Sequence, residues 1–332
     1  MTQEENIVRY NIKVPLNAFE IMQTIGIGSY GKVCLCKYKK NQKPYVIKML
    51  NKSEIIRTKQ VDHVFNEYNI LSFVNHPFIA ELKGVNVKDP KYLYFFLEYI
   101  PGGELFSILR KNRTFPIEQT KFYLAHIIII FEYLHSKNII YRDLKPENIL
   151  IKENGYIKLT DFGYAKILDV ASKTFTLCGT PGYLAPEIIL NKGHNKAVDW
   201  WTVGIFLYEL LVGIDPFNDD DPMQIYQNIV KGKIIFPTNI NKKAKSLIKH
   251  LLVSDISKRY GCLKGGVKDI IEHNFFHGFD WRGLIMQKIE APYIPEVKGK
   301  FDTSNYHESK DNAFEENEGV NINIDKDPFL DW

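Results

Sequence analysis

The chain has 332 residues, of which 45% are hydrophobic and 25% are charged, the composition of an ordinary globular protein. This length allows one large domain or two smaller ones, and the composition excludes a chain that is disordered throughout. The net charge is +4, but residues 302–332 hold nine acidic residues and two lysines, so this tail carries −7 and the rest of the chain +11.

Several classes of protein are excluded by missing signals. No apolar run approaches the roughly 18 residues that cross a bilayer, and the first residues, Met1-Thr2-Gln3-Glu4-Glu5, are too polar for a signal peptide. No motif that reads a nucleic-acid groove accompanies the basic charge. Four cysteines in a chain that shows no secretion signal indicate free thiols. We therefore expect a cytoplasmic protein without membrane-spanning segments or nucleic-acid partners, with the nucleus left open as a second location.

In the first third of the chain, a period of two dominates. Residues 19–50 alternate apolar and polar positions around glycines, which predicts an antiparallel sheet. A helix is predicted over 53–73, and strands follow at 80–87 and 92–99. Pro101-Gly102-Gly103 then interrupts the pattern and is a candidate hinge.

Beyond this hinge, helical periodicity takes over, and past about residue 276 the chain is irregular and acidic. Helices are predicted at 104–111, 117–137, 197–213, 222–231 and 242–252, with short strands at 149–152 and 156–159. The sequence therefore predicts an α+β fold with a small β-rich lobe, a larger helical lobe and a cleft between them.

Glycines are concentrated in Gly26-Ile-Gly28-Ser-Tyr-Gly31-Lys-Val33. Glycine lets backbone N–H groups approach an anion closely. Because Lys32–Tyr38 alternates like a strand, we expect a hairpin over nucleotide phosphates, with a plain tight turn as the alternative. Lys48, in the strand after this hairpin, would neutralise phosphate oxygens, and Glu67 in the following helix is its natural partner.

Three further motifs occur in order: Tyr141-Arg-Asp143-Leu-Lys145-Pro-Glu-Asn148, then Asp161-Phe-Gly163, then Ala185-Pro-Glu187. With these motifs the chain resembles the eukaryotic protein kinases. The resemblance implies that Asp161 and Asn148 hold two Mg²⁺ ions, since oxygen ligands suit this metal. It also implies that Asp143 orients the accepting hydroxyl and takes its proton, and that Lys145 steadies the transferred phosphate and indicates a serine/threonine kinase.

Other stretches resemble the AGC group of kinases, and most closely the catalytic subunits of cyclic-AMP-dependent protein kinase. They are Thr176-Leu-Cys178-Gly-Thr-Pro, Lys196-Ala-Val-Asp-Trp-Trp201, Glu290-Ala-Pro-Tyr-Ile-Pro, Asp302-Thr-Ser-Asn-Tyr306 and Phe329-Leu-Asp-Trp332. The implied fold is the bilobal protein-kinase fold. Its expected parts are an N-terminal extension (1–18), a kinase domain (19–276, with N-lobe 19–98, hinge 98–103 and C-lobe 104–276) and a C-terminal tail (277–332).

The resemblance implies ATP and two Mg²⁺ ions as cofactors. The implied ATP-binding residues are Ile25, Gly26, Gly28, Ser29, Tyr30, Gly31, Val33, Val46, Lys48, Glu98, Ile100, Glu104, Leu150 and Thr160. Lys48 and Glu67 join Asp143 and Lys145 as catalytic residues, and Leu71, Leu82, Tyr141 and Phe162 match an apolar column through both lobes.

The resemblance also implies a phosphorylation site at Thr176, whose phosphate would be held by Arg142, Lys166 and His63. It further implies a buried ion pair between Glu187 and Arg259, which would anchor this loop.

Glu104, Glu147 and Glu209 match carboxylates that bind arginines of the substrate, which favours Arg-Arg-x-Ser/Thr sites. Leu177, Pro181 and Leu184 would form an apolar pocket for the residue after the phosphoacceptor. The implied regulator is a cyclic-AMP-binding subunit in an inhibited heterotetramer, docking near Tyr226 and Phe175.

Five positions depart from the family pattern: Val46 replaces alanine, Gly182 a glutamate, Tyr164 a phenylalanine and Phe175 a tryptophan, and Asn321 falls near a phosphorylated serine. The acylated N-terminal helix of the family is also not evident in residues 1–18. Three other functions are weighed: the catalytic region of a cyclic-GMP-dependent kinase, another AGC kinase with basic substrates, and a pseudokinase scaffold.

Overall fold

The computed structural model describes residues 13–28, 30–169, 172–306 and 327–330. The chain divides into two compact units. Unit 1 comprises Met1–Gly103 together with Glu296–Trp332, and unit 2 comprises Glu104–Pro295.

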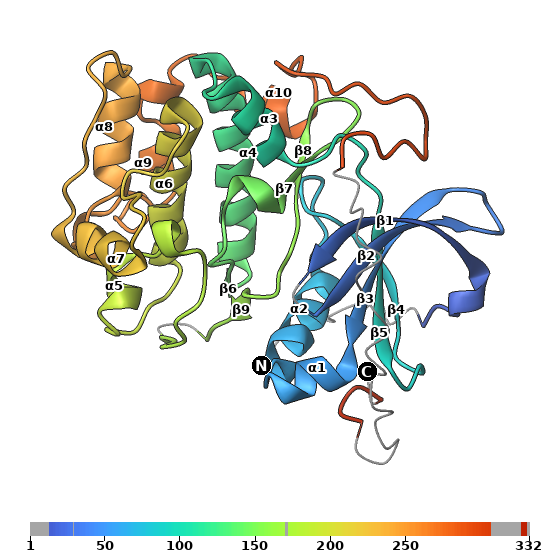
Figure 1. Cartoon of the computed structure of the whole chain (residues 1–332). Helices are drawn as coiled ribbons and strands as arrows, with labels where there is room; N and C mark the ends of the chain where they lie inside the picture. The colour runs from blue at the N-terminus through green and yellow to red at the C-terminus, as the bar shows by residue number, and fades with distance from the viewer. Residues whose placement is uncertain (1–12, 29, 170–171, 307–326, 331–332) are drawn as a thin grey trace, which may run out of the picture. The chain divides into compact units, whose positions relative to one another are not determined.

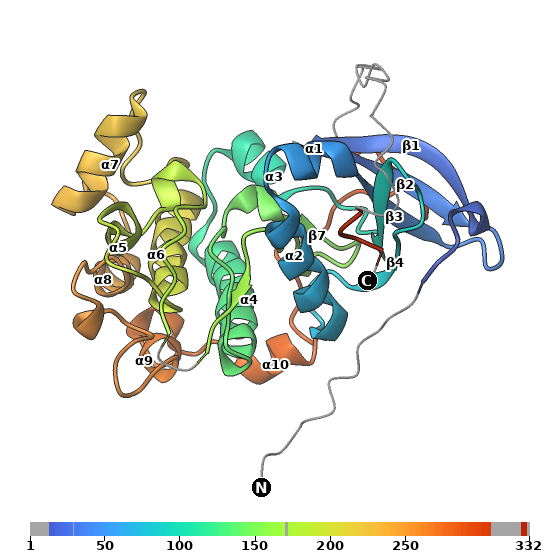
Figure 2. The same cartoon turned by 90° about the horizontal axis from the view of Figure 1, so that it is seen from below.

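Unit 1 contains a five-stranded antiparallel sheet in the order β1-β2-β3-β5-β4 (Figure 1). Its strands are β1 (Phe19–Gly28), β2 (Gly31–Tyr38), β3 (Pro44–Asn51), β4 (Leu82–Asn86) and β5 (Tyr92–Glu98). Two helices, α1 (Lys52–Arg57) and α2 (Val61–Phe73), connect β3 to β4 and lie beside the sheet in both views (Figure 1 and Figure 2).

The alternation of the strands sorts apolar side chains into two clusters, because successive side chains point to opposite faces of a sheet. One cluster contains Phe19, Cys34, Cys36, Ile47, Met49, Tyr94 and Phe96. The other contains Ile25, Leu35 and Val46, with Val33, Leu97, Tyr99, Phe301 and Tyr306 packed against it. The second cluster therefore gathers three of the predicted ATP-binding residues, Ile25, Val33 and Val46.

The single helix predicted over 53–73 is wrong, because the structure has two helices there. The Thr58 hydroxyl donates to the Glu54 carbonyl at 2.7 Å, and Lys59 follows with a left-handed φ of 58°. A residue in this conformation ends an α-helix. Periodicity in apolar positions continues across the break, which is why the sequence pattern did not reveal it.

Unit 2 is built around α4 (Ile117–Ser136) and α6 (Ala197–Val212), which run side by side and bury most of their residues (Figure 1). The other helices of this unit are α3 (Leu105–Asn112), α5 (Pro186–Ile189), α7 (Pro222–Lys231), α8 (Lys242–Leu251), α9 (Lys268–Ile271) and α10 (Trp281–Ile285). Its short strands are β6 (Ile139–Ile140), β7 (Ile149–Ile151), β8 (Ile157–Leu159) and β9 (Lys166–Ile167).

Most predicted elements are confirmed, and so is the α+β class, with a β-rich first unit and a mostly helical second one. The exceptions are short. The pair β6–β9 joins segments 26 residues apart that are too brief for a periodic signal. The helix α10 forms beyond residue 276, where we expected irregular chain, because the Asp280 side chain caps it by accepting from the Gly283 N–H at 2.8 Å. Among the described residues, no helix has the length and apolar character needed to cross a membrane.

Candidate active site

The glycine-rich segment forms the hairpin that its spacing predicted. Gly28 of β1 pairs with Gly31 of β2, and β2 continues as a strand. A Cβ atom on Gly31 would lie 1.7 Å from the Met49 carbonyl oxygen, so only glycine lets β2 approach β3 here. Ser29 lies outside the described residues.

Lys48 and Glu67 form the predicted ion pair. The Lys48 Nζ atom lies 2.7 Å and 2.9 Å from the two Glu67 carboxylate oxygens. Lys48 comes from β3 and Glu67 from α2, where its side chain is only 5% exposed. A buried carboxylate needs such a partner, so the pair fixes the position of the lysine ammonium.

The predicted hinge residues contact the chain's own C-terminal segment within unit 1. Ile100 is buried, and its carbonyl accepts a hydrogen bond from the Tyr306 hydroxyl at 2.5 Å. Asn305 donates to the Pro101 carbonyl at 3.1 Å, while Glu98 accepts from the Glu81 N–H at 2.8 Å. Tyr306 was not among the predicted site residues, although it ends a tail motif that the sequence displays.

In unit 2, Asp143 is the centre of a hydrogen-bond network on the loop between β6 and β7. Its Oδ2 atom lies 2.9 Å from both the Lys145 ammonium and the Asn148 amide nitrogen. Its Oδ1 atom accepts from the Thr180 hydroxyl at 3.0 Å, and Lys145 also donates to Thr180 at 3.2 Å. Burial alone would lower the pKa of Lys145, but the attraction and hydrogen bond of Asp143 outweigh it and raise the pKa.

The backbone of this loop is held in place by Asp199, a residue to which no role was assigned from the sequence. The fully buried Asp199 carboxylate accepts from the backbone N–H groups of Tyr141 and Arg142 at 3.0 Å and 2.8 Å. Its Oδ2 atom also lies 2.7 Å from the His135 ring. Arg142 adopts a φ of 69°, a conformation that such fixed contacts can sustain. The available signal was an aspartate in the first turn of a mostly apolar helix.

The oxygen atoms proposed for Mg²⁺ fit the chemistry of that ion. Asp161, at a φ of 55°, is exposed and accepts from the Gly163 N–H at 3.2 Å. Asn148 commits its amide nitrogen to Asp143, so its oxygen is the atom that can bind a metal. Among the described residues, no three histidine, cysteine or acidic side chains cluster around one point.

The remaining predicted ATP-binding residues of unit 2 are Glu104, Leu150 and Thr160, and they lie close to the loop that carries Asp143 and Asn148. The Thr160 hydroxyl donates to the Asn148 carbonyl at 3.1 Å, and Glu104 pairs with Leu150 in an isolated bridge. Tyr141 and Phe162 are buried with ring centroids 5.2 Å apart, so the two members of the apolar column in this unit are in contact. Leu71 and Leu82 are buried in unit 1.

The predicted phosphorylation site, Thr176, is exposed. Arg142 donates its Nε–H to the Tyr164 carbonyl at 2.7 Å, and burial lowers its pKa. Lys166 donates to the hydroxyl of Thr174 at 3.2 Å, not to Thr176. His63, the third predicted partner, belongs to unit 1, where its Nδ1 atom lies 2.7 Å from the Gln60 side-chain oxygen.

The predicted ion pair between Glu187 and Arg259 is present and bidentate, with distances of 2.7 Å and 3.0 Å. Both side chains are buried, and Arg259 also donates to the carbonyls of Val253 and Ala197. This pair joins α5 to the chain after α8.

Two carboxylates of unit 2, those of Glu209 and Asp215, are close enough for the charge of Asp215 to act on Glu209. Burial raises the pKa of Glu209 to about 7, although Tyr183 donates a hydrogen bond to it. Asp215 was not predicted, yet its carboxylate lies against Gly182: a Cβ atom there would be 2.9 Å from the Asp215 Cγ atom. The only sequence signal was the glycine itself, which stands where the family pattern has a glutamate.

The other predicted substrate-binding residues of unit 2 differ in their exposure to solvent. Glu147 is partly buried, in the short 3-10 helix Pro146–Asn148. Leu177 is 64% exposed and Pro181 is exposed, whereas Leu184 is buried. A common apolar pocket for these three residues stays a prediction.

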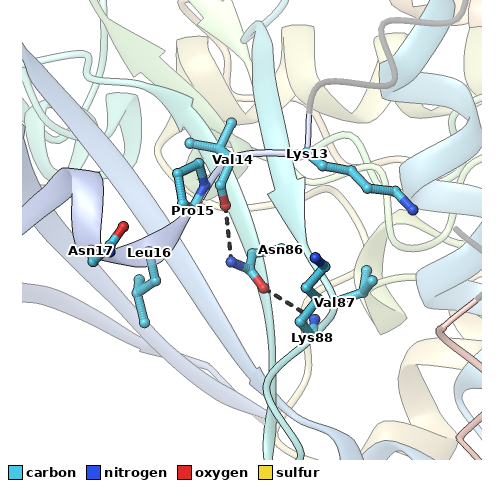
Figure 3. Close-up of a pocket in the computed structure, with 8 residues that line it drawn as sticks. All are labelled: Lys13, Val14, Pro15, Leu16, Asn17, Asn86, Val87 and Lys88. Carbon is cyan, nitrogen blue, oxygen red and sulfur yellow. Dashed lines mark hydrogen bonds between the residues drawn. The ribbon is translucent and has the colours of Figure 1, made fainter.

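A cavity of about 290 Å³ lies elsewhere in unit 1, between residues 13–17 and 86–88 (Figure 3). The Asn86 amide bridges its two walls, donating to the Val14 carbonyl at 2.9 Å and accepting from the Lys88 N–H at 3.1 Å. None of the predicted site residues lines this cavity.

Comparison with known proteins agrees with this geometry. The family model described as "Protein kinase domain" matches residues 19–276. The chain is 46% identical over 300 residues to the human cAMP-dependent protein kinase catalytic subunit PRKX, covering 90% of this chain and 83% of that protein. It is 43% identical over 320 residues to cAMP-dependent protein kinase type 3 of Saccharomyces cerevisiae, covering 96% of this chain and 78% of that protein.

Some relatives are longer. The chain is 46% identical over 294 residues to cAMP-dependent protein kinase catalytic subunit 3 of Drosophila melanogaster, covering 89% of this chain but only 50% of that protein. The chain thus spans about half the length of that relative and most of the length of the other two. On these matches, the chain belongs to the protein kinase family, within the group of cAMP-dependent protein kinase catalytic subunits.

Proposed function

We propose that this chain transfers the γ-phosphoryl group of ATP to serine and threonine hydroxyls of proteins, at sites preceded by arginines. The observation that carries the proposal is the network around Asp143, which holds Lys145, Asn148 and Thr180 at 2.9–3.0 Å from one carboxylate. Intact Lys48 and Glu67, paired at 2.7 Å, argue against a scaffold without activity.

In unit 1, the glycine-rich hairpin, Lys48 and an apolar cluster would bind the nucleotide. The hairpin at Gly28 and Gly31 offers backbone N–H groups to the phosphates, and the Lys48 ammonium pairs with phosphate oxygens. Ile25 and Val46 lie in one apolar cluster and would pack on the adenine. Val46 makes this site narrower than an alanine would.

Two Mg²⁺ ions would be held by Asp161 and Asn148, and when bound they neutralise charge on the β- and γ-phosphates. The Asp161 carboxylate and the Asn148 amide oxygen are the atoms for this role. Asn148 is kept in place by its hydrogen bonds to the carbonyl and carboxylate of Asp143.

Asp143 would orient the incoming hydroxyl and accept its proton as the new O–P bond forms and the bond to the leaving ADP breaks. Hydrogen bonds from two sides hold its carboxylate in place, so little reorganisation is needed during the reaction. Lys145 would steady the transferred phosphoryl group from its position beside Asp143 and Thr180.

Substrate choice would follow from the carboxylates Glu104, Glu147 and Glu209, which favour Arg-Arg-x-Ser/Thr sites through bidentate pairing. Glu209 is supported most strongly, because a buried carboxylate with a raised pKa gains most from a cationic partner. Leu177, Pro181 and Leu184 would receive the residue after the phosphoacceptor.

Regulation would come from a cyclic-AMP-binding subunit that inhibits the chain in a heterotetramer. Phe175 is 62% exposed, as a docking residue should be, and Tyr226 lies on α7. The expected location is the cytoplasm, with the nucleus left open as a second location, in keeping with four cysteines that are all free thiols.

The test is phosphorylation of a peptide panel by purified protein with Mg²⁺ and labelled ATP. We expect transfer to Arg-Arg-x-Ser peptides, weak transfer when either arginine becomes alanine, and inhibition by a regulatory subunit that cyclic AMP relieves. Equal rates across the panel would contradict the substrate class. Inhibition without relief by cyclic AMP would contradict the regulator but not the enzyme.

A further inference from the structure

Four polar side chains converge in unit 2 close to the predicted phosphorylation site. Thr174 and His194 form an isolated antiparallel bridge and exchange both backbone hydrogen bonds at 2.9 Å. Side chains of such directly opposed residues lie on the same face of the pair. The Lys166 ammonium donates to the Thr174 hydroxyl at 3.2 Å. Because His194 lies directly opposite Thr174, its ring is close to the Lys166 side chain.

Two of these side chains are buried and have a nitrogen atom without a hydrogen-bond partner among the described residues. His194 is 2% exposed and Arg142 is 5% exposed. Neither the His194 Nε2 atom nor the Arg142 Nη1 atom has a hydrogen-bond partner among the residues that the structure describes. Because an unpaired buried polar group costs free energy, a ligand that forms hydrogen bonds with both atoms would be stabilised here, next to the Lys166 ammonium. The Nε–H of Arg142 is fixed by the Tyr164 carbonyl, which sets the direction of the guanidinium.

The charges around His194 select an anion. Burial, and next the charge of Arg142, lower the pKa of His194 to about 4, so the ring is neutral at pH 7. Lys166 adds positive charge, while Glu187 and Asp199 act in the opposite direction. Those two carboxylates are already bound by Arg259 and by backbone N–H groups with His135. A neutral imidazole beside two cations can donate one N–H to an oxyanion.

Thr176 is the residue that can bring such an anion. It lies only two positions after Thr174, whose hydroxyl accepts a hydrogen bond from the Lys166 ammonium at 3.2 Å, so a phosphate on Thr176 would be attached close to this cation. Its side chain is exposed, so a kinase can reach it.

We propose that His194 is a further ligand of the phosphate on Thr176, donating its Nε2–H to a phosphate oxygen beside Arg142 and Lys166. This inference rests on the proposed phosphorylation of Thr176. It assigns His194 a positioning role: the ring stabilises the phosphorylated loop and slows removal of the phosphate.

The test compares phosphorylated and phosphatase-treated forms of four full-length proteins: wild type, His194→Leu, His194→Gln and the control His126→Gln. His126 is equally buried, in α4, where its Nδ1 atom lies 2.7 Å from the Phe122 carbonyl oxygen. The readouts are the rise in Tm on phosphorylation and the rate at which a phosphatase removes the Thr176 phosphate, followed by mass spectrometry.

We expect His194→Leu to lose a third or more of the rise in Tm and its phosphate to be removed roughly fivefold faster, since a charge-assisted hydrogen bond is lost. His194→Gln, which retains an N–H donor, should recover most of both. His126→Gln should lower the Tm of both forms equally and leave the rise unchanged, as a purely structural residue would.

Two results overturn the inference, and they are distinguishable. An unchanged rise and an unchanged removal rate in His194→Leu, with phosphate present on Thr176, would contradict the role of His194 alone. Absence of phosphate on Thr176 in active wild-type protein would contradict the proposed phosphorylation and the inference together.

Discussion

The two units position their functional side chains in different ways. In unit 1, Lys48 and Glu67 project from a regular strand and a regular helix and meet in one ion pair. In unit 2, Asp143 and Asn148 belong to a loop whose backbone is held by the buried carboxylate of Asp199. Regular elements place a side chain through their own geometry, whereas a catalytic loop depends on buried polar contacts. Damage to the loop should therefore cost both activity and stability.

The largest effect is expected at Asp143 itself. Asp143→Asn removes the carboxylate that we propose accepts the proton, and kcat should fall about 10²- to 10⁴-fold with little change in the KM for ATP. Steady-state peptide phosphorylation measures both values. Asp169→Asn, an exposed acid of the same unit, is the matched control and should behave as wild type. A loss confined to the KM for ATP would contradict the role of Asp143.

Asp199 and Glu67 give the sharpest contrast between the units. Asp199→Asn places an amide against N–H donors in a buried site, and the free energy of unfolding should fall by about 3 kcal/mol while activity is also lost. Glu67→Gln leaves Lys48 partly exposed to water, so stability should fall by about 1 kcal/mol or less. Urea unfolding of both variants measures this difference. Equal losses in the free energy of unfolding would contradict the contrast between the two units.

A pH dependence is expected at Glu209. Burial raises the pKa of this carboxylate to about 7, and arginine binds the ionised form. The KM for arginine-containing peptides should therefore fall up to about tenfold from about pH 6 to about pH 8, a trend that Glu209→Gln abolishes. The folded state holds this proton more tightly than the unfolded chain, so the same ionisation lowers stability as pH rises. A KM that rises with pH in the wild type would contradict the assignment.

The smallest effect is expected at Asp215, whose carboxylate lies against Gly182. Asp215→Asn should raise the KM for peptides with additional arginines about two- to fivefold and leave the KM for ATP unchanged. Asp220→Asn, an exposed acid before α7, serves as control. If both variants respond alike, Asp215 has no particular part in substrate binding.

The same contrast explains how much could be predicted from sequence. The hairpin at Gly28–Gly31 and the pair of Lys48 with Glu67 were predicted correctly because period-two strands and helical spacing are local patterns. The break at Lys59 was missed because it depends on one backbone angle within a continuous apolar pattern.

In unit 2 the motifs predicted the candidate catalytic residues, but not the contacts that hold them in place. Asp199 contacts backbone 57 and 58 residues away, and His194 pairs with Thr174 across a loop. Asp215 is recognisable only through the space left at Gly182. Such contacts are set by tertiary packing, so no periodicity of the sequence reveals them.

The most direct test of the central claim is transfer of labelled γ-phosphate from ATP to an Arg-Arg-x-Ser peptide by the wild type and Lys48→Met. Transfer that requires Mg²⁺ and falls by about 10² or more in Lys48→Met is the predicted result. A wild-type protein that carries phosphate on Thr176 yet transfers none, or a Lys48→Met protein as active as the wild type, would contradict it.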